Sequence, residues 1–257
     1  MNLPFKQTDQ DVFDFFARAL ITDVPGVPAF DPQRSVDGER GIEILQPVPT
    51  SSEGLDLEIS PEIVGVYDKG GNMIQEMMQS LVDRKTGQIF ARLTSKAFGI
   101  GQGGYGGPKG PPTVNYIPPD REPDAVYVYQ TTPETALLYR LCGDYNPIHA
   151  DDRFAQEGGF EGAFLQGLGT WNIAAHGVLM KLGESDAGRL KSFKARFAKV
   201  VYPNDALETS MWVVGEKTVK GRALDEVVFQ TIVKEDSRVV LSNGFAELWK
   251  KEVQSRL

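Results

Sequence analysis

The first part of the chain shows a helical pattern followed by strand patterns. Apolar residues recur at three- and four-residue spacing over residues 8–20, and Thr8 with Asp11 resembles a capping box, so we expect a helix there. Alternating or β-branched apolar residues then predict four strands, over residues 41–48, 55–67, 72–82 and 88–98. Turn-forming residues separate the last three of these. This part is therefore predicted to be a helix followed by an antiparallel sheet.

The second part of the chain repeats this plan after a Gly- and Pro-rich stretch at 99–119. Thr132-Pro133-Glu134 marks a helix start, residues 167–182 favour a second helix, and strand patterns run from Ser192 to Trp249. Residues 82–98 and 233–248 can be aligned as strand, polar turn and strand, which indicates an internal duplication. We therefore divide the chain into residues 1–100, a linker at 101–123, and residues 124–257.

The helix predicted at 167–182 is suited to lie inside a curved sheet. Small residues permit close approach to the sheet, while larger apolar ones fill volume. One helix covering one small antiparallel sheet, twice over, predicts an α+β fold of two fused helix-wrapped sheets, known as a double hot dog. The first half would shape a tail pocket, and the second half would hold the reactive groups.

Composition limits the classes of function. The 257 residues, 41% hydrophobic and 24% charged, are typical of a globular protein, and no apolar stretch or leader pattern predicts a membrane span or a secretory signal. The net charge of −8 argues against general nucleic-acid binding. Cys142 is the only cysteine and there are two histidines, so we expect no intrachain disulfide, no metal and no redox cofactor.

The segment from Gly143 to His149 holds the most informative chemistry. On a continuous helix Asp144 and His149 would point about 140° apart. Pro147 disfavours the helical conformation at Asn146, and Gly143 loosens the entry, so the chain is expected to turn and direct both side chains at one water. Such a pair suits general acid–base addition of water. The N–H of Gly167, at a helix start, is suited to bind a developing negative oxygen.

This segment resembles the signature of the MaoC-like, type-2 enoyl-CoA hydratases, in which Gly-Asp precedes an aromatic residue and Asn-Pro-x-His. The likeness extends over nearly the whole chain, including 37–40, 68–70, 103–107, 123–126 and 194–199. It implies (3R)-specific hydration of trans-2-enoyl-CoA by Asp144 and His149, with Asn146 placing a water and Gly167 as oxyanion donor. It further implies an acyl-CoA site formed by Asp37, Gly38, Lys69, Tyr145, Pro147, Ile148 and Phe197.

Two positions depart from the family pattern. The family usually has histidine where this chain has Gln166, and again where it has Asp37. Because the oxyanion donor is the backbone amide of Gly167, the first change should leave oxyanion binding intact. The preference for acyl chain length stays open.

Two other functions remain open from the sequence. One is a dehydratase of fatty-acid or polyketide assembly that acts on acyl-carrier thioesters, and the other is a non-catalytic hot dog that binds acyl-CoA. Cys142, which precedes the motif, is expected to be a small buried residue rather than a nucleophile. Lys194 and Arg196 are expected on the solvated face of a strand, where they could also meet the phosphates of CoA.

The last three residues, Ser255-Arg256-Leu257, resemble the Ser-Lys-Leu address read by the peroxisomal import receptor. Together with the family resemblance they predict a peroxisomal enzyme of fatty-acid β-oxidation. The resemblance also favours a homodimer.

Overall fold

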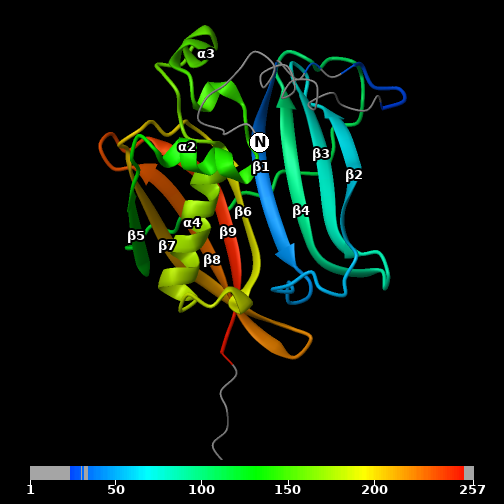
Figure 1. The fold of residues 1–257 in the computed structure, drawn as a ribbon, viewed down its shortest axis with the longest axis vertical. Coiled ribbons are helices and arrows are strands. Elements are labelled where there is room, and N and C mark those ends of the chain that lie inside the picture. The colour runs from blue at the N-terminus through cyan, green and yellow to red at the C-terminus, as the bar shows by residue number, and fades with distance from the viewer. Residues whose placement is uncertain (1–23, 30, 32–33, 252–257) are drawn as a thin grey trace, which may run out of the picture.

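The described residues of the computed structural model are 24–29, 31 and 34–251, so the helix predicted at 8–20 and the tail at 255–257 lie outside them. Nine strands form one antiparallel sheet in the order β2-β3-β4-β1-β6-β9-β8-β7-β5 (Figure 1). They are β1 (Ser35–Ile44), β2 (Leu57–Asp68), β3 (Met73–Asp83), β4 (Gln88–Gly99), β5 (Ala125–Gln130), β6 (Leu190–Phe197), β7 (Ala206–Val219), β8 (Arg222–Val233) and β9 (Val239–Trp249).

The strand order is what an internal duplication would produce. The order β1-β4-β3-β2 in the first half matches β6-β9-β8-β7 in the second, and β1 pairs with β6 between them. The register of β2 shifts between Ile63 and Gly65, and that of β7 shifts between Val213 and Gly215. These two strands occupy equivalent places in the two halves, and each is irregular just before a glycine. The boundaries at 100 and 124 remain a prediction.

Helix α4 (Gly167–Leu182) covers the second half of the sheet on one face, where it contacts β5, β6, β7 and β9 (Figure 1). Small residues permit this packing, since a Cβ on Gly177 would lie 2.4 Å from the Tyr127 ring. Trp171, Ala174 and Val178 are buried against Phe193 and its apolar neighbours on the strands. The helix predicted at 167–182 is confirmed at both ends.

Short helical segments connect β5 to α4. They are α2 (Thr135–Tyr139), η2 (Arg140–Cys142), η3 (Pro147–His149) and α3 (Asp152–Glu157), and η4 (Ala187–Arg189) precedes β6. All of these segments therefore follow residue 130. No helix in the part of the chain that the structure describes is long and apolar enough to cross a membrane.

Two strands differ from their prediction. The strand expected at 41–48 begins six residues earlier and ends at Ile44, because the residues from Ser35 pair with β4 and Glu39 binds Arg196 on β6. Strand β5 was not predicted at all. It is a short edge strand, and its pairing with β7, rather than its own pattern, defines it.

The Gly- and Pro-rich segment between the halves is held against the sheet. The carboxylate of Asp68 accepts hydrogen bonds from the N–H groups of Gly104 (2.9 Å) and Gly106 (2.8 Å). Further on, the Tyr116 ring stacks on Phe245 at 4.3 Å, and Lys194 donates to the Tyr116 hydroxyl. Lys194 alternates with the core residues Phe193 and Ala195, so this segment crosses the face opposite α4.

Candidate active site

The turn between Asp144 and His149 forms as its residue types require. Gly143 adopts a left-handed φ of 105°, and Asn146 is extended with φ −54° and ψ 122°. Pro147 then opens η3, and the Asn146 side chain caps it by accepting from the N–H of Ile148 at 3.2 Å. The predicted turn is confirmed.

His149 faces Asp144 across a short gap. Its Nε2 lies 4.0 Å from Oδ2 of Asp144, and the histidine side chain is 10% exposed against 37% for the aspartate. On the other side of the ring, Nδ1 lies 2.9 Å from the carbonyl oxygen of Phe164. Because a carbonyl oxygen only accepts, Nδ1 carries the hydrogen, which leaves Nε2 of the neutral ring as a free base directed at Asp144.

Burial controls the charge of His149. Burial lowers the pKa of the imidazole, although the Asp144 carboxylate opposes that shift by favouring the protonated ring. The pair is therefore a neutral base beside a carboxylate. A separation of 4.0 Å exceeds a direct hydrogen bond, so the two atoms are placed to share one small hydroxylic molecule.

A buried arginine holds the turn from behind. Arg140 is 1% exposed and donates from NH1 to the carbonyl oxygen of Asn146 at 2.9 Å. The N–H of Asn146 in turn donates to Oδ1 of Asp144 at 3.2 Å. Among the described residues the Nδ2 amide of Asn146 has no acceptor, so its N–H groups are free to donate beside the pair.

Gly167 begins α4, and its N–H donates to no acceptor in the described ranges, as expected for the first residue of a helix. A Cβ at this position would lie 3.2 Å from the Phe197 ring, so glycine permits the close approach of β6 to the helix start. The free N–H and the positive end of the helix favour a negative oxygen there.

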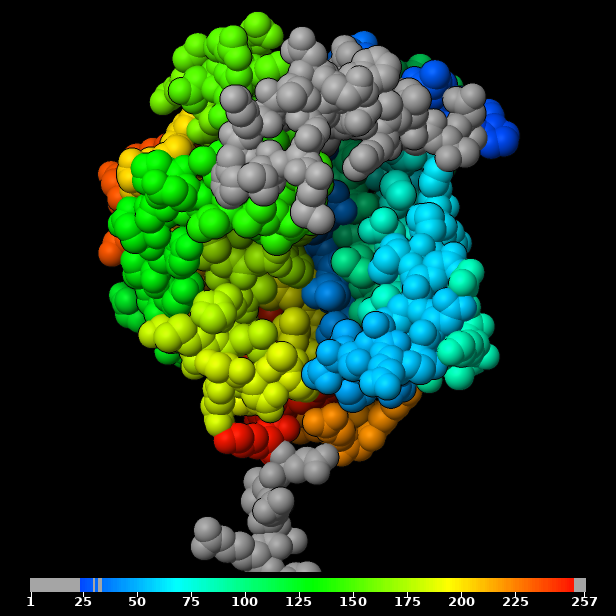
Figure 2. Space-filling view, viewed as in Figure 1, coloured from blue at the N-terminus to red at the C-terminus, as the bar shows by residue number. Residues whose placement is uncertain are grey.

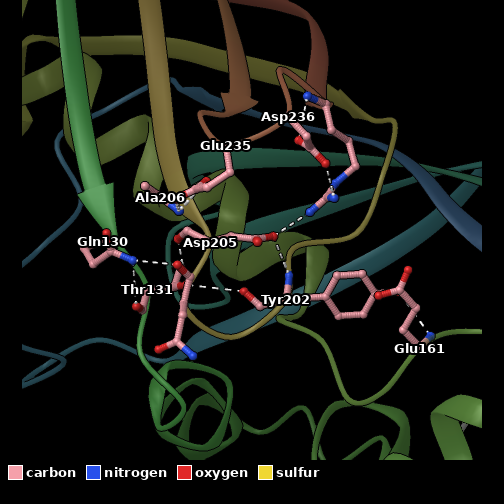
Figure 3. A network of polar contacts seen from close by, with 10 residues as sticks. Gln130, Thr131, Glu161, Tyr202, Asp205, Ala206, Glu235 and Asp236 are labelled. Atoms are coloured by element: carbon pink, nitrogen blue, oxygen red, sulfur yellow. Dashed lines mark hydrogen bonds and ion pairs between the residues drawn. The ribbon is translucent and has the colours of Figure 1, made fainter.

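A polar network around Asp205 holds the loop between β6 and β7 (Figure 3), and this loop contacts the segment that leads to Gly167. The N–H of Leu165 donates to the carbonyl oxygen of Val201 at 2.8 Å, which ties the segment to the loop between β6 and β7. That loop is held in turn by Asp205, whose carboxylate accepts from Arg238 at 2.6 Å and from the N–H of Tyr202 at 2.8 Å. The backbone next to the Phe164 carbonyl, which orients His149, is therefore held by this loop.

The first half brings Asp37 and Arg40 to this site. Both lie on the face of β1 that meets α4, since Arg40 pairs with Ala195 in the register, and the indole of Trp171 donates to the Arg40 carbonyl at 3.1 Å. Arg40 Nε lies 2.7 Å from Oδ2 of Asp37. Partial burial raises the pKa of Asp37, the Arg40 guanidinium opposes the shift, and Asp144 is close enough to raise it further. Asp37 therefore lies near the Asp144–His149 pair.

The remaining predicted residues have different surroundings. Gly38 forms a bulge in β1, where a Cβ would lie 2.0 Å from the Phe98 ring, so its need for glycine is structural. Pro147 is buried, Ile148 and Phe197 are partly buried, and Tyr145 lies under the Arg140 guanidinium at 5.8 Å. Lys69 is exposed at the end of edge strand β2, three strands from β1, where it donates to the Lys109 carbonyl. The structure does not bring Lys69 to the Asp144–His149 pair.

Four polar residues of this region were not predicted: Arg40, Tyr139, Arg140 and Asn172. Asn172 on α4 donates to the Tyr139 hydroxyl at 3.0 Å. Burial, with smaller effects from Cys142 and Asp144, raises the pKa of Tyr139 to about 12, so its hydroxyl keeps its proton. In the sequence, only the three-residue spacing of Asp37 and Arg40 could have indicated that Arg40 belongs to this region. Tyr139, Arg140 and Asn172 are brought there by tertiary packing.

The prediction that Cys142 is buried was wrong. Its side chain is exposed, because η2 turns Arg140 inward instead. Lys194 and Arg196 lie on the face of the sheet opposite α4. There Lys194 donates to Tyr116, and Arg196 donates to Asn115 and Glu39. No three His, Cys, Asp or Glu side chains gather as a candidate metal site within the described residues.

Residues 114–236 match the family described as MaoC like domain. The chain is 42% identical over 257 aligned residues to Probable dehydratase NIT22 of Ajellomyces capsulatus, covering 96% of this chain and 68% of that protein. It is 37% identical over 219 residues to Probable enoyl-CoA hydratase 2 of Dictyostelium discoideum, covering 84% of this chain and 71% of that protein. The chain belongs to the MaoC-like family.

Members of the MaoC-like family with longer chains also match. Mouse Peroxisomal multifunctional enzyme type 2 is 34% identical over 230 residues, which cover 89% of this chain and 29% of the mouse protein. With relatives named as hydratases and dehydratases, this MaoC-like chain is a hydro-lyase.

Solved structures confirm the fold of the MaoC-like chain. A MaoC-like dehydratase from Phytophthora capsici superposes with a TM-score of 0.78 at 30% identity, covering 99% of this chain and 82% of that one. A Mycobacterium tuberculosis protein described as having a double hotdog fold matches with a TM-score of 0.55 at 16% identity, covering 85% of this chain and 77% of that one. The predicted α+β double hot dog is confirmed.

Proposed function

We propose that this chain hydrates trans-2-enoyl-CoA reversibly to (3R)-3-hydroxyacyl-CoA, with Asp144 and His149 as the catalytic pair. The observation that carries the proposal is the pair of acceptors, Nε2 of His149 and Oδ2 of Asp144, which face each other at 4.0 Å. A water molecule has two O–H groups to donate to them. The relatives named as enoyl-CoA hydratases support the choice of thioester.

In the proposed reaction the water donates one O–H to Nε2 of His149 and the other to Asp144. As the oxygen adds to C3, the first proton moves to Nε2, and negative charge develops on the thioester oxygen. The N–H of Gly167 stabilises that oxygen, and the Asp144 carboxylate stabilises the imidazolium. The imidazolium then delivers its proton to C2, which completes the addition of water and restores the neutral ring.

The remaining predicted residues have supporting roles in this proposal. The free amide of Asn146 helps to place the water or the substrate carbonyl. Tyr145, Pro147, Ile148 and Phe197 form the walls near the reacting carbons, and Asp37 and Gly38 line the first-half side. Lys69 would contact the CoA part of the substrate, since it lies away from Asp144 and His149.

The test is a set of matched variants assayed on trans-2-decenoyl-CoA with chiral analysis of the product. Asp144→Asn and His149→Ala should each lower kcat/KM by roughly 10²–10⁴-fold with an unchanged circular dichroism spectrum, because each removes a proton-transfer group. His176→Ala, which changes an exposed histidine on α4, and Asp120→Asn are the controls. Near wild-type turnover by either variant of the pair, or an S product from the wild type, would contradict the proposal.

A second candidate is a dehydratase acting on acyl-carrier thioesters, favoured by the name of the relative from Ajellomyces capsulatus. Both reactions use the same chemistry in opposite directions. Turnover of one acyl group presented on CoA and on acyl-carrier protein separates them. Preference for the carrier protein would select the dehydratase, and binding of acyl-CoA without turnover of either thioester would select the non-catalytic alternative.

We further propose that the enzyme acts in peroxisomal β-oxidation. Relatives named as peroxisomal enzymes support this site of action. A fluorescent protein that carries residues 250–257 at its C-terminus should form puncta with a peroxisomal marker, and removal of Ser255-Arg256-Leu257 should disperse them. Diffuse fluorescence from the intact fusion would count against the import receptor as a partner.

We also propose that the chain forms a homodimer. Sedimentation velocity of the purified protein over a range of concentrations measures its mass directly. A single species at the mass of one chain would contradict the dimer.

A further inference from the structure

The two halves of the sheet differ sharply on the face that meets α4. In the second half this face is buried and mainly apolar, as Phe193, Met211 and Phe229 show, and its buried Thr209 and Thr231 hydroxyls bond to each other at 2.9 Å. In the first half the corresponding face carries five polar side chains. They are Asp37, Arg40, Gln75, Gln79 and Ser95.

Strand register places four of these polar side chains in two neighbouring rows, and Gln79 in a third row opposite Leu93. Asp37 on β1 pairs with Ala97 on β4, which pairs with Gln75 on β3. In the next row Arg40 pairs with Ser95. Residues directly opposite one another in an antiparallel sheet point to the same face, so both rows share the face of Trp171 and of the catalytic pair.

Gln75 is not an ordinary solvated side chain. It is 4% exposed, and no group in the described part of the chain makes a hydrogen bond with its side chain. Arg40 is only partly paired. Asp37 accepts from its Nε, while its two terminal nitrogens have no acceptor among the described residues. Donors that are left without partners near a reaction centre are the groups that a bound ligand satisfies.

The surroundings of these donors are apolar and form a hollow. Ile42, Met77 and Leu93 alternate with the polar residues on the same face. Figure 2 shows β1, in dark blue, set back between the α4 side and the β2–β4 side. A chain bound there would meet mainly methylene contacts, interrupted by the Arg40 and Gln75 donors.

The charges select the kind of group that fits. The Arg40 guanidinium is already paired with the Asp37 carboxylate at 2.7 Å, so it offers hydrogen-bond donors but no uncompensated positive charge to a further carboxylate. A neutral oxygen that accepts hydrogen bonds would satisfy Arg40 and Gln75 without needing such a charge.

We infer that Arg40 and Gln75 determine specificity for an acyl chain that bears a neutral oxygen, a hydroxyl or keto group, beyond the reacting carbons. This rests on the proposed hydration of enoyl-CoA. Neighbouring strands lie about 4.8 Å apart, so Gln75 is two strand spacings, roughly 10 Å, from Asp37. The oxygen therefore belongs in the middle or distal part of the chain, not beside the double bond.

The experiment compares trans-2-decenoyl-CoA with its 6-, 8- and 10-hydroxy derivatives and with a ten-carbon ω-carboxy analogue. The wild type should prefer at least one hydroxy derivative by roughly tenfold or more in kcat/KM, expressed mainly in KM. Gln75→Leu should remove most of this preference while decenoyl-CoA is still hydrated. Arg40→Met should lower the ratio of kcat/KM between the hydroxy derivative and decenoyl-CoA, whatever it does to the absolute rates. Glu76→Gln, the next residue on β3 but on the opposite face, should keep it.

The possible failures are distinguishable. Hydration of decenoyl-CoA as good as that of every hydroxy derivative overturns the specificity but leaves the proposed function standing. The same holds if both variants keep the wild-type preference, or if the ω-carboxy analogue is the best substrate. No hydration of any of these thioesters overturns the proposed function and this inference together.

Discussion

His149 is held in the protonation state that a base requires. Because burial lowers its pKa below the ordinary 6.5, the ring is neutral at neutral pH and gains its proton only in acid. The pH profile of kcat/KM for hydration should therefore stay level as pH falls to about 6.5 and decline only below it. An acid limb centred above pH 7, measured with trans-2-decenoyl-CoA, would show that the ring is not the buried base described here.

The same shift links His149 to stability. The unfolded chain binds this proton more readily than the folded chain, so the folded state loses free energy of unfolding as pH falls below about 6.5. Above that pH both states are neutral and the group contributes no pH dependence. Denaturant unfolding of the wild type and of His149→Ala at several pH values should show a smaller acid loss in the variant.

Gln166 is the second residue with an unusual setting. It is 1% exposed and donates from Nε2 to the Ala136 carbonyl at 3.2 Å, while its Oε1 has no hydrogen-bond partner among the described residues. Gln166→Glu should bury a carboxylate there, which raises that group's pKa and makes stability fall as pH rises above about 4.3. Gln166→Leu, which adds no charge, should lack this dependence. Parallel melting curves of the two variants at pH 5 and pH 8 provide the measurement; equal pH dependence would contradict the burial.

At the scale of elements, the pairing of β1 with β6 joins the two halves of the sheet, and Glu39 lies at one end of that pairing, opposite Arg196. Its side chain is 16% exposed and accepts from Lys96 at 2.7 Å and from Arg196 at 2.9 Å, one partner on each side. Burial alone would raise the pKa of Glu39, but the two cations outweigh it and lower the pKa. The ionised form therefore favours the folded state.

Glu39→Gln should destabilise the protein by about 1–3 kcal/mol at neutral pH, because two partly buried cations lose their counter-charge. Since the folded pKa is lowered, the wild-type advantage is present above the unfolded value of about 4.3 and is lost as pH falls through the folded pKa. Urea unfolding is the measurement, with Glu62→Gln on the exposed part of β2 as the matched control. An unchanged urea midpoint for Glu39→Gln would show that the ion pairs of Glu39 do not stabilise the junction between β1 and β6.

Some elements could be predicted from local sequence patterns alone, and others could not. The helix at 167–182 was predictable because its small and large residues follow one helical face, and the turn at 143–149 because Gly143 and Pro147 act on their own neighbours. Strand β5 and the first half of β1 were not, since cross-strand partners, rather than their own sequence, hold them in the sheet.

At the scale of the whole molecule, the duplication is unequal. The two halves share a strand order, yet only the second carries the acid and base, and residues 1–148 contain no histidine. We therefore expect one active site per chain. Isothermal titration calorimetry with a non-reactive enoyl-CoA analogue should give a stoichiometry of about one per chain. Two equal sites per chain would contradict the proposal that only the second half holds the reactive groups.

The sequence by itself determined what depends on neighbouring residues: the turn that separates Asp144 from His149, the start of α4 at Gly167, and the family. Only the tertiary structure decided which groups meet there. The Phe164 carbonyl selects the tautomer of His149, and Asp37 and Arg40 arrive from the first half, more than 100 residues away. Local φ and ψ preferences reach only a few residues, whereas strand register and burial, which place distant side chains together, are properties of the completed sheet.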